Sequence, residues 1–214
     1  MAEIKTGILG GVSGKVGSIV GAIWKGKNTI RTIPRTSNKK ASVKQINQRS
    51  KFKLVSSFLQ PLNFLLQRYF GAEQGLKSRA NLALAYHLQE AVDQTDDQFT
   101  IKFEKVILSK GVLPTITLES AAIENETLAL TWTTPEEMSL GKQTDLLTVV
   151  VYGKNTKLIA NFHRVVVRSA NSYSVKLHPE LAADDCFLWY FVTDEKDEEC
   201  STSMFISTVT SDVE

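Results

Sequence analysis

The sequence has little cysteine: its 214 residues include two, Cys186 and Cys200. They flank an acidic stretch, Asp194–Glu199, between two runs of residues typical of β-strands. A hairpin centred near Lys196 would place Cys186 far from Cys200, whereas a disulfide requires Cα atoms within about 7 Å of each other. We therefore expect two free, reduced thiols, as is typical of a cytoplasmic protein.

Long hydrophobic runs are also lacking. The longest apolar stretch, Ile8–Trp24, is rich in glycine and interrupted by Lys15, whereas a membrane-spanning helix needs about 20 apolar residues. The first residues do not show the basic and then apolar pattern of a secretory signal. We expect a soluble, cytoplasmic protein without a transmembrane segment. A membrane-surface segment that carries Lys15, Lys25 and Lys27 stays an alternative.

Acidic residues are absent between Glu3 and Glu73, and this absence is the most informative feature of the chain. Residues 1–81 hold 15 Lys and Arg against two acids, whereas residues 82–214 hold 10 Lys and Arg against 21 acids. The net charge of +2 conceals this asymmetry. A basic segment joined to an acidic domain indicates an acidic partner, which could be nucleic acid, an anionic membrane or a neighbouring copy.

Residue patterns that carry catalysis or metal binding are missing. Gly10–Val16 resembles a phosphate-binding loop, but the first glycine of that motif is replaced by Leu9 and the Ser or Thr after the lysine by Val16. The acidic stretch Asp194–Glu199 lacks the spacing of a calcium loop, which favours a solvated hairpin tip. The sequence also shows no metal-ligand or triad spacing around its three histidines, His87, His163 and His178. We expect no enzymatic activity, no cofactor and no metal.

The first 98 residues favour a small basic region followed by helices. Seven of the 12 glycines lie within the first 26 residues, which disfavours a helix there. Alternation would place Val16, Val20 and Trp24 on one side of an extended segment, and a turn at Lys25–Asn28 predicts a glycine-rich hairpin that ends at Pro34. Ser42 and Gln45 have capping-box spacing, so a helix should begin near residue 43, with a kink or break at Pro61. A second helix is predicted over 77–94.

From Phe99 onward the apolar residues follow a period of two, which favours an antiparallel β-sandwich of the immunoglobulin or fibronectin type. Trp132 and Trp189 are candidate core residues. The predicted fold class is α+β, with a basic hairpin and helical region over 1–98 and a β-sandwich domain over 99–214. The predicted strands are Phe99–Leu108, Leu113–Glu119, Thr127–Thr134, Asp145–Tyr152, Lys157–Phe162, Arg164–Arg168, Tyr173–Leu177, Cys186–Thr193 and Ser203–Thr210.

In the glycine-rich stretches Gly7–Gly11 and Ser13–Gly17, and again at Trp24–Gly26 and Arg49–Phe52, the chain resembles a family of uncharacterised bacterial proteins, classed as a domain of unknown function. The resemblance is densest over residues 7–62 and weakens to a pattern of strands beyond about residue 120. It implies that the N-terminal part is the shared working element, and it implies no activity, cofactor or catalytic residue. The matching stretches are Gly7–Gly11, Ser13–Gly17, Val20–Gly21, Trp24–Gly26, Ile30–Arg31, Pro34, Gln45, Arg49–Phe52, Phe58–Leu62 and Lys105–Leu113.

The sequence therefore predicts a non-enzymatic binding or structural protein whose basic N-terminal region contacts an acidic partner. Nucleic acid is one candidate, because a run of cations with an interleaved aromatic residue suits phosphates and bases. The alternative is a self-assembling, shell-like component in which the basic arm docks on the acidic sandwich of a neighbouring subunit. The candidate contact residues are Trp24, Lys25, Lys27, Arg31, Arg35, Lys39, Lys40, Lys44, Arg49 and Lys51.

Overall fold

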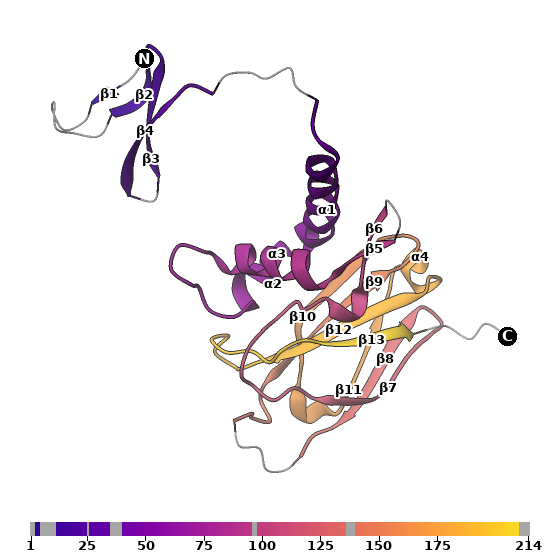
Figure 1. Ribbon diagram of the computed structural model, residues 1–214. Helices are drawn as coiled ribbons and strands as arrows, with labels where there is room; N and C mark the ends of the chain where they lie inside the picture. The colour runs from indigo at the N-terminus through magenta and orange to yellow at the C-terminus, as the bar shows by residue number, and fades with distance from the viewer. Residues whose placement is uncertain are drawn as a thin grey trace. The chain divides into compact units, whose positions relative to one another are not determined.

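The computed structural model describes residues 3–4, 12–24, 26–34, 40–95, 98–135 and 140–209. The chain divides into two compact units, Met1–Ile46 and Asn47–Glu214 (Figure 1). The sequence-based boundary between residues 98 and 99 falls inside the second unit. The reason is that the helices pack against a β-sheet of the sandwich and share its hydrophobic core.

The first unit contains an antiparallel sheet in the order β1-β2-β3-β4. Its strands are β1 Glu3–Ile4, β2 Val12–Val16, β3 Ile19–Trp24 and β4 Lys27–Thr32. The chain reverses after β2 at Gly17 and after β3 at Gly26, whose φ values of 55° and 76° suit glycine. Because the chain turns at Gly17, Val16 pairs with Ile19 and lies on the other face from Val20 and Trp24. The expectation that these three share a side is therefore wrong for Val16.

Helix α1, Val43–Leu59, begins at the capping box that the sequence predicts. The backbone N–H of Ser42 donates to Oε1 of Gln45 at 3.0 Å, and the N–H of Gln45 faces Oγ of Ser42 at 3.4 Å. The helix gives way to a 3₁₀ turn, η1 Gln60–Leu62, at Pro61, and then to α2, Asn63–Tyr69. Helix α3, Arg79–Glu90, begins at Ser78, whose side chain caps it.

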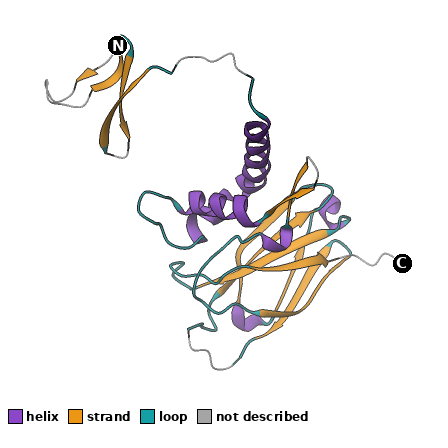
Figure 2. Ribbon diagram, viewed as in Figure 1, coloured by secondary structure: helices purple, strands orange, loops and turns teal. Residues whose placement is uncertain are grey.

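The sandwich consists of two antiparallel sheets (Figure 2). The three-stranded sheet has the order β11-β8-β7, and the four-stranded sheet has the order β10-β9-β12-β13. A separate hairpin joins β5 Val92–Thr95 to β6 Gln98–Ile101. The remaining elements are η2 Phe103–Lys105, β7 Thr117–Glu124, β8 Thr127–Thr133, β9 Leu146–Gly153, β10 Ile159–Val167, η3 Arg168–Ala170, β11 Ser172–Lys176, α4 Pro179–Ala182, β12 Cys186–Thr193 and β13 Met204–Val209.

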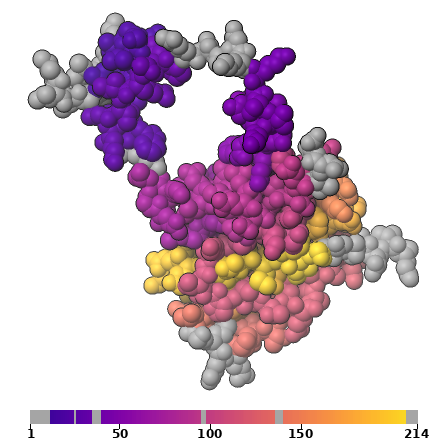
Figure 3. All heavy atoms as spheres, viewed as in Figure 1, coloured from indigo at the N-terminus to yellow at the C-terminus, as the bar shows by residue number. Residues whose placement is uncertain are grey.

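The four-stranded sheet is buried on both faces. Val149 and Val151 of β9 pack toward the three-stranded sheet, in a core that also contains Trp132. Val150 of β9 and Trp189 of β12 face the other way and pack against helices α1 to α3. Figure 3 shows the yellow atoms of β13 between the magenta helical region and the pink strands. Both tryptophans that the sequence marks as core residues are indeed buried.

Two predicted strands differ from the structure. The segment that begins at Leu113 forms only one isolated parallel bridge, to Ser201, so β7 starts later, at Thr117. The strand expected over residues 99–108 ends at Ile101, because the chain then forms the short turn η2. In addition, the two strands expected over 157–162 and 164–168 form the single strand β10, and residues 92–94, expected at the end of the second helix, lie in β5. The other expected strands overlap observed ones. The thiols of Cys186 and Cys200 are both free and buried, as expected.

Candidate functional site

One face of the N-terminal sheet carries basic side chains beside a tryptophan. Trp24 pairs across the strands with Lys27, and Val20 pairs with both Lys15 and Arg31. Directly paired residues project to the same face of an antiparallel sheet, and residues two apart on a strand share a face. Lys15, Lys27 and Arg31 therefore share the face of Trp24. Every residue of β4 is exposed, and Trp24 is 60% exposed.

The opposite face of the same sheet is apolar and exposed. Val16 pairs with Ile19, and the neighbouring pairs bring Ile23 and Ile30 to this face. All four side chains are exposed, with Ile30 at 64%. At the centre of this face, Gly21 is buried beneath the backbone of Val12. The register thus places Lys15, Lys27 and Arg31 on one face and the four exposed apolar side chains on the other.

The described basic residues of α1 do not share one face. Lys44 and Lys51 are seven residues apart, so they project from the same side of the helix. Arg49 lies on roughly the opposite side by the period of 3.6 residues per turn. Lys44 and Arg49 are exposed, and Lys51 is partly buried.

The structure therefore brings three of the predicted contact residues together on one surface: Trp24, Lys27 and Arg31. Lys40 is exposed and precedes α1. Three other candidates, Lys25, Arg35 and Lys39, lie outside the described residues. The ion pairs between described residues all involve residue 68 or later ones. The described cations of the N-terminal sheet and α1 therefore form no ion pair with a described carboxylate.

The second unit contains a polar cluster that the sequence does not reveal. The Tyr69 hydroxyl of α2 donates to Oδ1 of Asp197 at 2.6 Å and lies 2.6 Å from Nε2 of His163. Because the hydroxyl proton goes to Asp197, the hydroxyl oxygen accepts from His163, which places a proton on Nε2. Arg164 approaches the same carboxylate oxygen at 2.6 Å, and Arg68 also pairs with Asp197.

Local backbone geometry positions the cluster. The pairing of β10 with β9 shifts register between Phe162 and Val166, and Arg164 within this irregularity has φ of 53°. Asp197 has φ of 65° in the acidic turn, where the Asp194 carboxylate accepts from three backbone N–H groups. A bulge redirects side chains relative to the regular alternation of a strand. It brings His163 to the Tyr69 hydroxyl and Arg164 to the Asp197 carboxylate.

The environment of this cluster shifts its pKa values. Burial raises the pKa of Tyr69, and its bond to Asp197 acts in the same direction. Burial would also raise the pKa of Asp197, but hydrogen bonds from Tyr69 and Arg164 outweigh this and hold the pKa below its usual value. Burial lowers the pKa of His163 against the opposing charge of Asp197. The carboxylate is fully engaged by its partners, so the cluster joins α2 to the sandwich.

No short motif could have revealed this cluster, since Tyr69 lies 94 residues from His163 and 128 from Asp197. Two of the three histidines have hydrogen-bond partners in space: His163 contacts the Tyr69 hydroxyl, and Nδ1 of His87 contacts the Ala83 carbonyl at 2.7 Å. Within the part of the chain that the structure describes, no group of three or more His, Cys, Asp and Glu side chains could hold a metal ion.

The described helices include none with both the length and the apolar character needed to cross a bilayer.

Comparisons with known proteins give a family and a weak structural likeness. The chain matches no curated protein. Among solved structures, it is similar to the fibronectin type-III domain of human fibronectin type III domain containing protein 3, with 13% identity, 48% of this chain and 90% of that domain covered, and a TM-score of 0.30. A human fourth FNIII domain is similar at 12% identity, with 57% of this chain and 98% of that domain covered and a TM-score of 0.29. Residues 11–207 match the family described as "Family of unknown function (DUF6266)", and the chain belongs to this family.

Proposed function

We propose that the chain is a non-enzymatic binding protein whose N-terminal basic sheet contacts nucleic acid through phosphates and stacked bases. The observation that carries this proposal is the strand register, which places Lys15, Lys27 and Arg31 on the exposed face of Trp24. Lysine and arginine neutralise phosphates without reading sequence, and an exposed aromatic ring stacks on any base. Such a surface favours single strands with little sequence preference.

The charge of the first unit supports the same partner. Residues 1–46 contain nine Lys and Arg and one acid, Glu3, whereas residues 47–214 contain 16 Lys and Arg and 22 acids. The acidic second unit would repel a polyanion, which confines binding to the N-terminal surface. We further propose a fibronectin-type sandwich as the scaffold, on the basis of its three strands in the order β11-β8-β7 against four in the order β10-β9-β12-β13.

The test is fluorescence anisotropy with labelled single strands and duplexes at about 50 mM salt, followed by a salt series. We expect binding that weakens steeply as salt rises, and a loss of affinity in the double variant Lys27→Gln/Arg31→Gln. The matched control is Lys154→Gln/Lys176→Gln, which removes two charges from exposed lysines of the second unit. Undetectable binding at low salt, or equal losses in both double variants, would refute the proposal.

Tryptophan fluorescence provides an independent readout. Of the three tryptophans, Trp132 and Trp189 are buried, and Trp24 is exposed. Stacking of a base on Trp24 should quench the exposed component of the emission. The variant Trp24→Phe should abolish that quench while keeping the salt-dependent binding. A quench that persists in this variant would show that the base does not stack on Trp24.

Self-assembly is a second candidate, and the apolar face of the N-terminal sheet favours it. Val16, Ile19, Ile23 and Ile30 are all exposed on this face, and exposed apolar faces mark protein interfaces. A second copy would cover this face, while basic side chains contact its acidic sandwich. Light scattering should then show several subunits, which Ile23→Thr/Ile30→Thr and Arg31→Gln/Arg49→Gln should each dissociate. A monomer at all concentrations and salts would contradict this candidate.

A further inference from the structure

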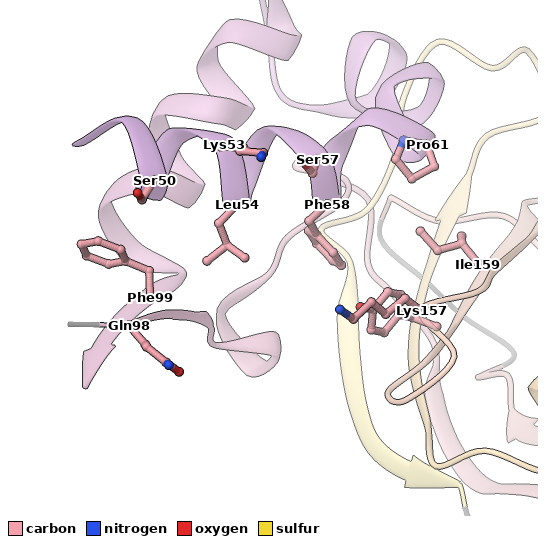
Figure 4. A pocket seen from close by; sticks show the side chains of 11 residues that line it. Ser50, Lys53, Leu54, Ser57, Phe58, Pro61, Gln98, Phe99, Lys157 and Ile159 are labelled. Atoms are coloured by element: carbon pink, nitrogen blue, oxygen red, sulfur yellow. The ribbon is translucent and has the colours of Figure 1, made fainter. Parts of the chain in front are cut away.

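A groove of about 600 Å³ lies in the second unit between α1, the β5–β6 hairpin and the end of strands β9 and β10 (Figure 4). Pockets that hold small molecules have volumes of about 300–1,000 Å³. The groove lies on different residues from the basic sheet and is unrelated to its proposed role. Its size suits a ligand with one or two rings.

The walls of the groove are apolar and aromatic. Phe58 of α1 and Tyr152 of β9 are buried core residues whose rings meet edge to face, with centroids 5.5 Å apart. Leu54 of α1, Pro61 of η1, Phe99 of β6 and Ile159 of β10 also contribute to the apolar lining. Figure 4 shows Leu54 and Phe58 projecting from the helix toward the space that Phe99 and Ile159 border. Because two of these residues belong to the packed core, this part of the groove is preformed.

Two lysines enter the lining from separate elements, Lys53 from α1 and Lys157 from the turn between β9 and β10. Among the described residues that line the groove there is no acid, although acids outnumber basic residues in the second unit as a whole. Neither lysine forms an ion pair with a described carboxylate. The described lining thus carries two cations and no acid.

The turn that carries Lys157 is held in place by a carboxylate. Asp184 accepts hydrogen bonds from the backbone and side chain of both Asn155 and Thr156, at 2.7 to 2.9 Å. The N–H of Lys157 then donates to the Gly153 carbonyl at 2.9 Å, and Lys157 adopts a left-handed φ of 58°. A non-glycine residue in this conformation requires support from its surroundings. The backbone beneath the ammonium group is therefore fixed.

We propose that this groove binds a small amphipathic organic anion, with a ring-sized apolar body and one acidic group. The apolar body lies against Leu54, Phe58 and Ile159, and the acidic group contacts the ammonium groups of Lys53 and Lys157. Apolar burial supplies affinity, and the two cations select the anion over a neutral molecule of the same shape.

The test titrates the full chain with 8-anilino-1-naphthalenesulfonate and, separately, with N-phenyl-1-naphthylamine, which has the same rings without the sulfonate. We expect saturable binding of both probes, with the anion bound more tightly. The double variant Lys53→Gln/Lys157→Gln should weaken binding of the anion about tenfold, since a charge-assisted bond is lost. Binding of the neutral probe should change less than about twofold in that variant, because its contacts are apolar.

The matched control is Lys27→Gln/Arg31→Gln, which removes two charges from the N-terminal sheet and should leave the affinity for the anion unchanged. The variant Ile23→Thr/Ile30→Thr separates the groove from the apolar face of that sheet, where the probe could bind, and should also leave the affinity of the groove for the anion unchanged. A second groove variant, Leu54→Asp, should abolish binding of both probes at this site, with circular dichroism verifying the fold. Equal affinity for the two probes, no saturable binding, or an equal effect of the two double variants would overturn the proposal.

Discussion

The hydroxyl of Tyr69 donates to the carboxylate of Asp197 at 2.6 Å and so joins helix α2 to the turn between β12 and β13. Replacing Tyr69 with Phe removes this bond and leaves His163 without its partner. We expect a loss of about 1–3 kcal/mol in the free energy of unfolding, as for other hydrogen bonds to charged groups. Urea denaturation measures this difference.

The matched control for that prediction is Tyr173→Phe. Tyr173 lies on β11 and is partly buried, and the described residues provide no hydrogen bond to its hydroxyl. Its loss should change the free energy of unfolding by less than about 0.5 kcal/mol. If Tyr69→Phe and Tyr173→Phe lower the free energy of unfolding by the same amount, the hydrogen bond between Tyr69 and Asp197 makes no specific contribution to stability.

A buried ion pair should be sensitive to the loss of one partner. Arg168 and Asp145 are both almost fully buried, with Nη2 and Oδ2 3.2 Å apart, and Arg168 also donates to the Pro114 carbonyl. Arg168→Met leaves the Asp145 carboxylate buried without its cation, which should cost about 3–5 kcal/mol.

The exposed pair of Lys176 and Glu126 is the control, because a solvated pair contributes about 0–1 kcal/mol. Lys176→Met should therefore shift the urea midpoint little. If Arg168→Met shifts the urea midpoint as little as Lys176→Met does, Asp145 must form a hydrogen bond to water or to another partner in the variant.

Stability should fall as the pH decreases below about 6.5, the ordinary pKa of histidine. Burial lowers the pKa of His87 in the folded state, and the N–H of Ile107 donates to its Nε2 at 3.3 Å. Below that pH the unfolded chain binds a proton that folded His87 does not, so the free energy of unfolding decreases with falling pH. His163 contributes in the same direction, because its pKa is also lowered.

One such histidine can contribute a slope of at most about 1.4 kcal/mol per pH unit. Urea denaturation at several pH values measures the slope, and NMR titration of the His87 ring measures its pKa directly. A ring that titrates at or above the usual value, together with stability that does not change with pH, would contradict the prediction.

The variant Gly21→Ala should disrupt the N-terminal sheet. A Cβ atom at this position would clash with the backbone carbonyl of Val12, which lies directly over Gly21. We expect the NMR signals of residues 12–34 to lose their strand-like shifts while those of the second unit persist. The neighbouring change Ala22→Gly adds no atom and should keep the sheet. Unchanged signals in Gly21→Ala would show that β2 can move away from β3.

Much of the fold is encoded in local sequence signals. The capping box at Ser42 and Gln45 marks the start of α1, and Pro61 marks its end, because both act on backbone groups within a few residues. Most strands were visible from the period of two. The layering was not visible, because β9 and β12 are apolar on both faces and the sequence does not show which layer covers each face.

The candidate surface was predictable in its composition and not in its geometry. The absence of acids between Glu3 and Glu73 is enough to identify a basic segment from the sequence alone. Only the register shows that Trp24 and Arg31 share a face and that Ile23 lies on the other, since a shift of one residue exchanges the two faces.

The sequence alone determined the charge asymmetry, the helix ends and most of the strands, because these depend on composition and on neighbours along the chain. Tertiary structure decided the contact between Tyr69, His163 and Asp197, and the groove between Phe58 and Lys157. Hydrogen bonds and packing act over a few ångströms in space. Their partners here lie up to 128 residues apart in the chain, a distance that no local pattern records.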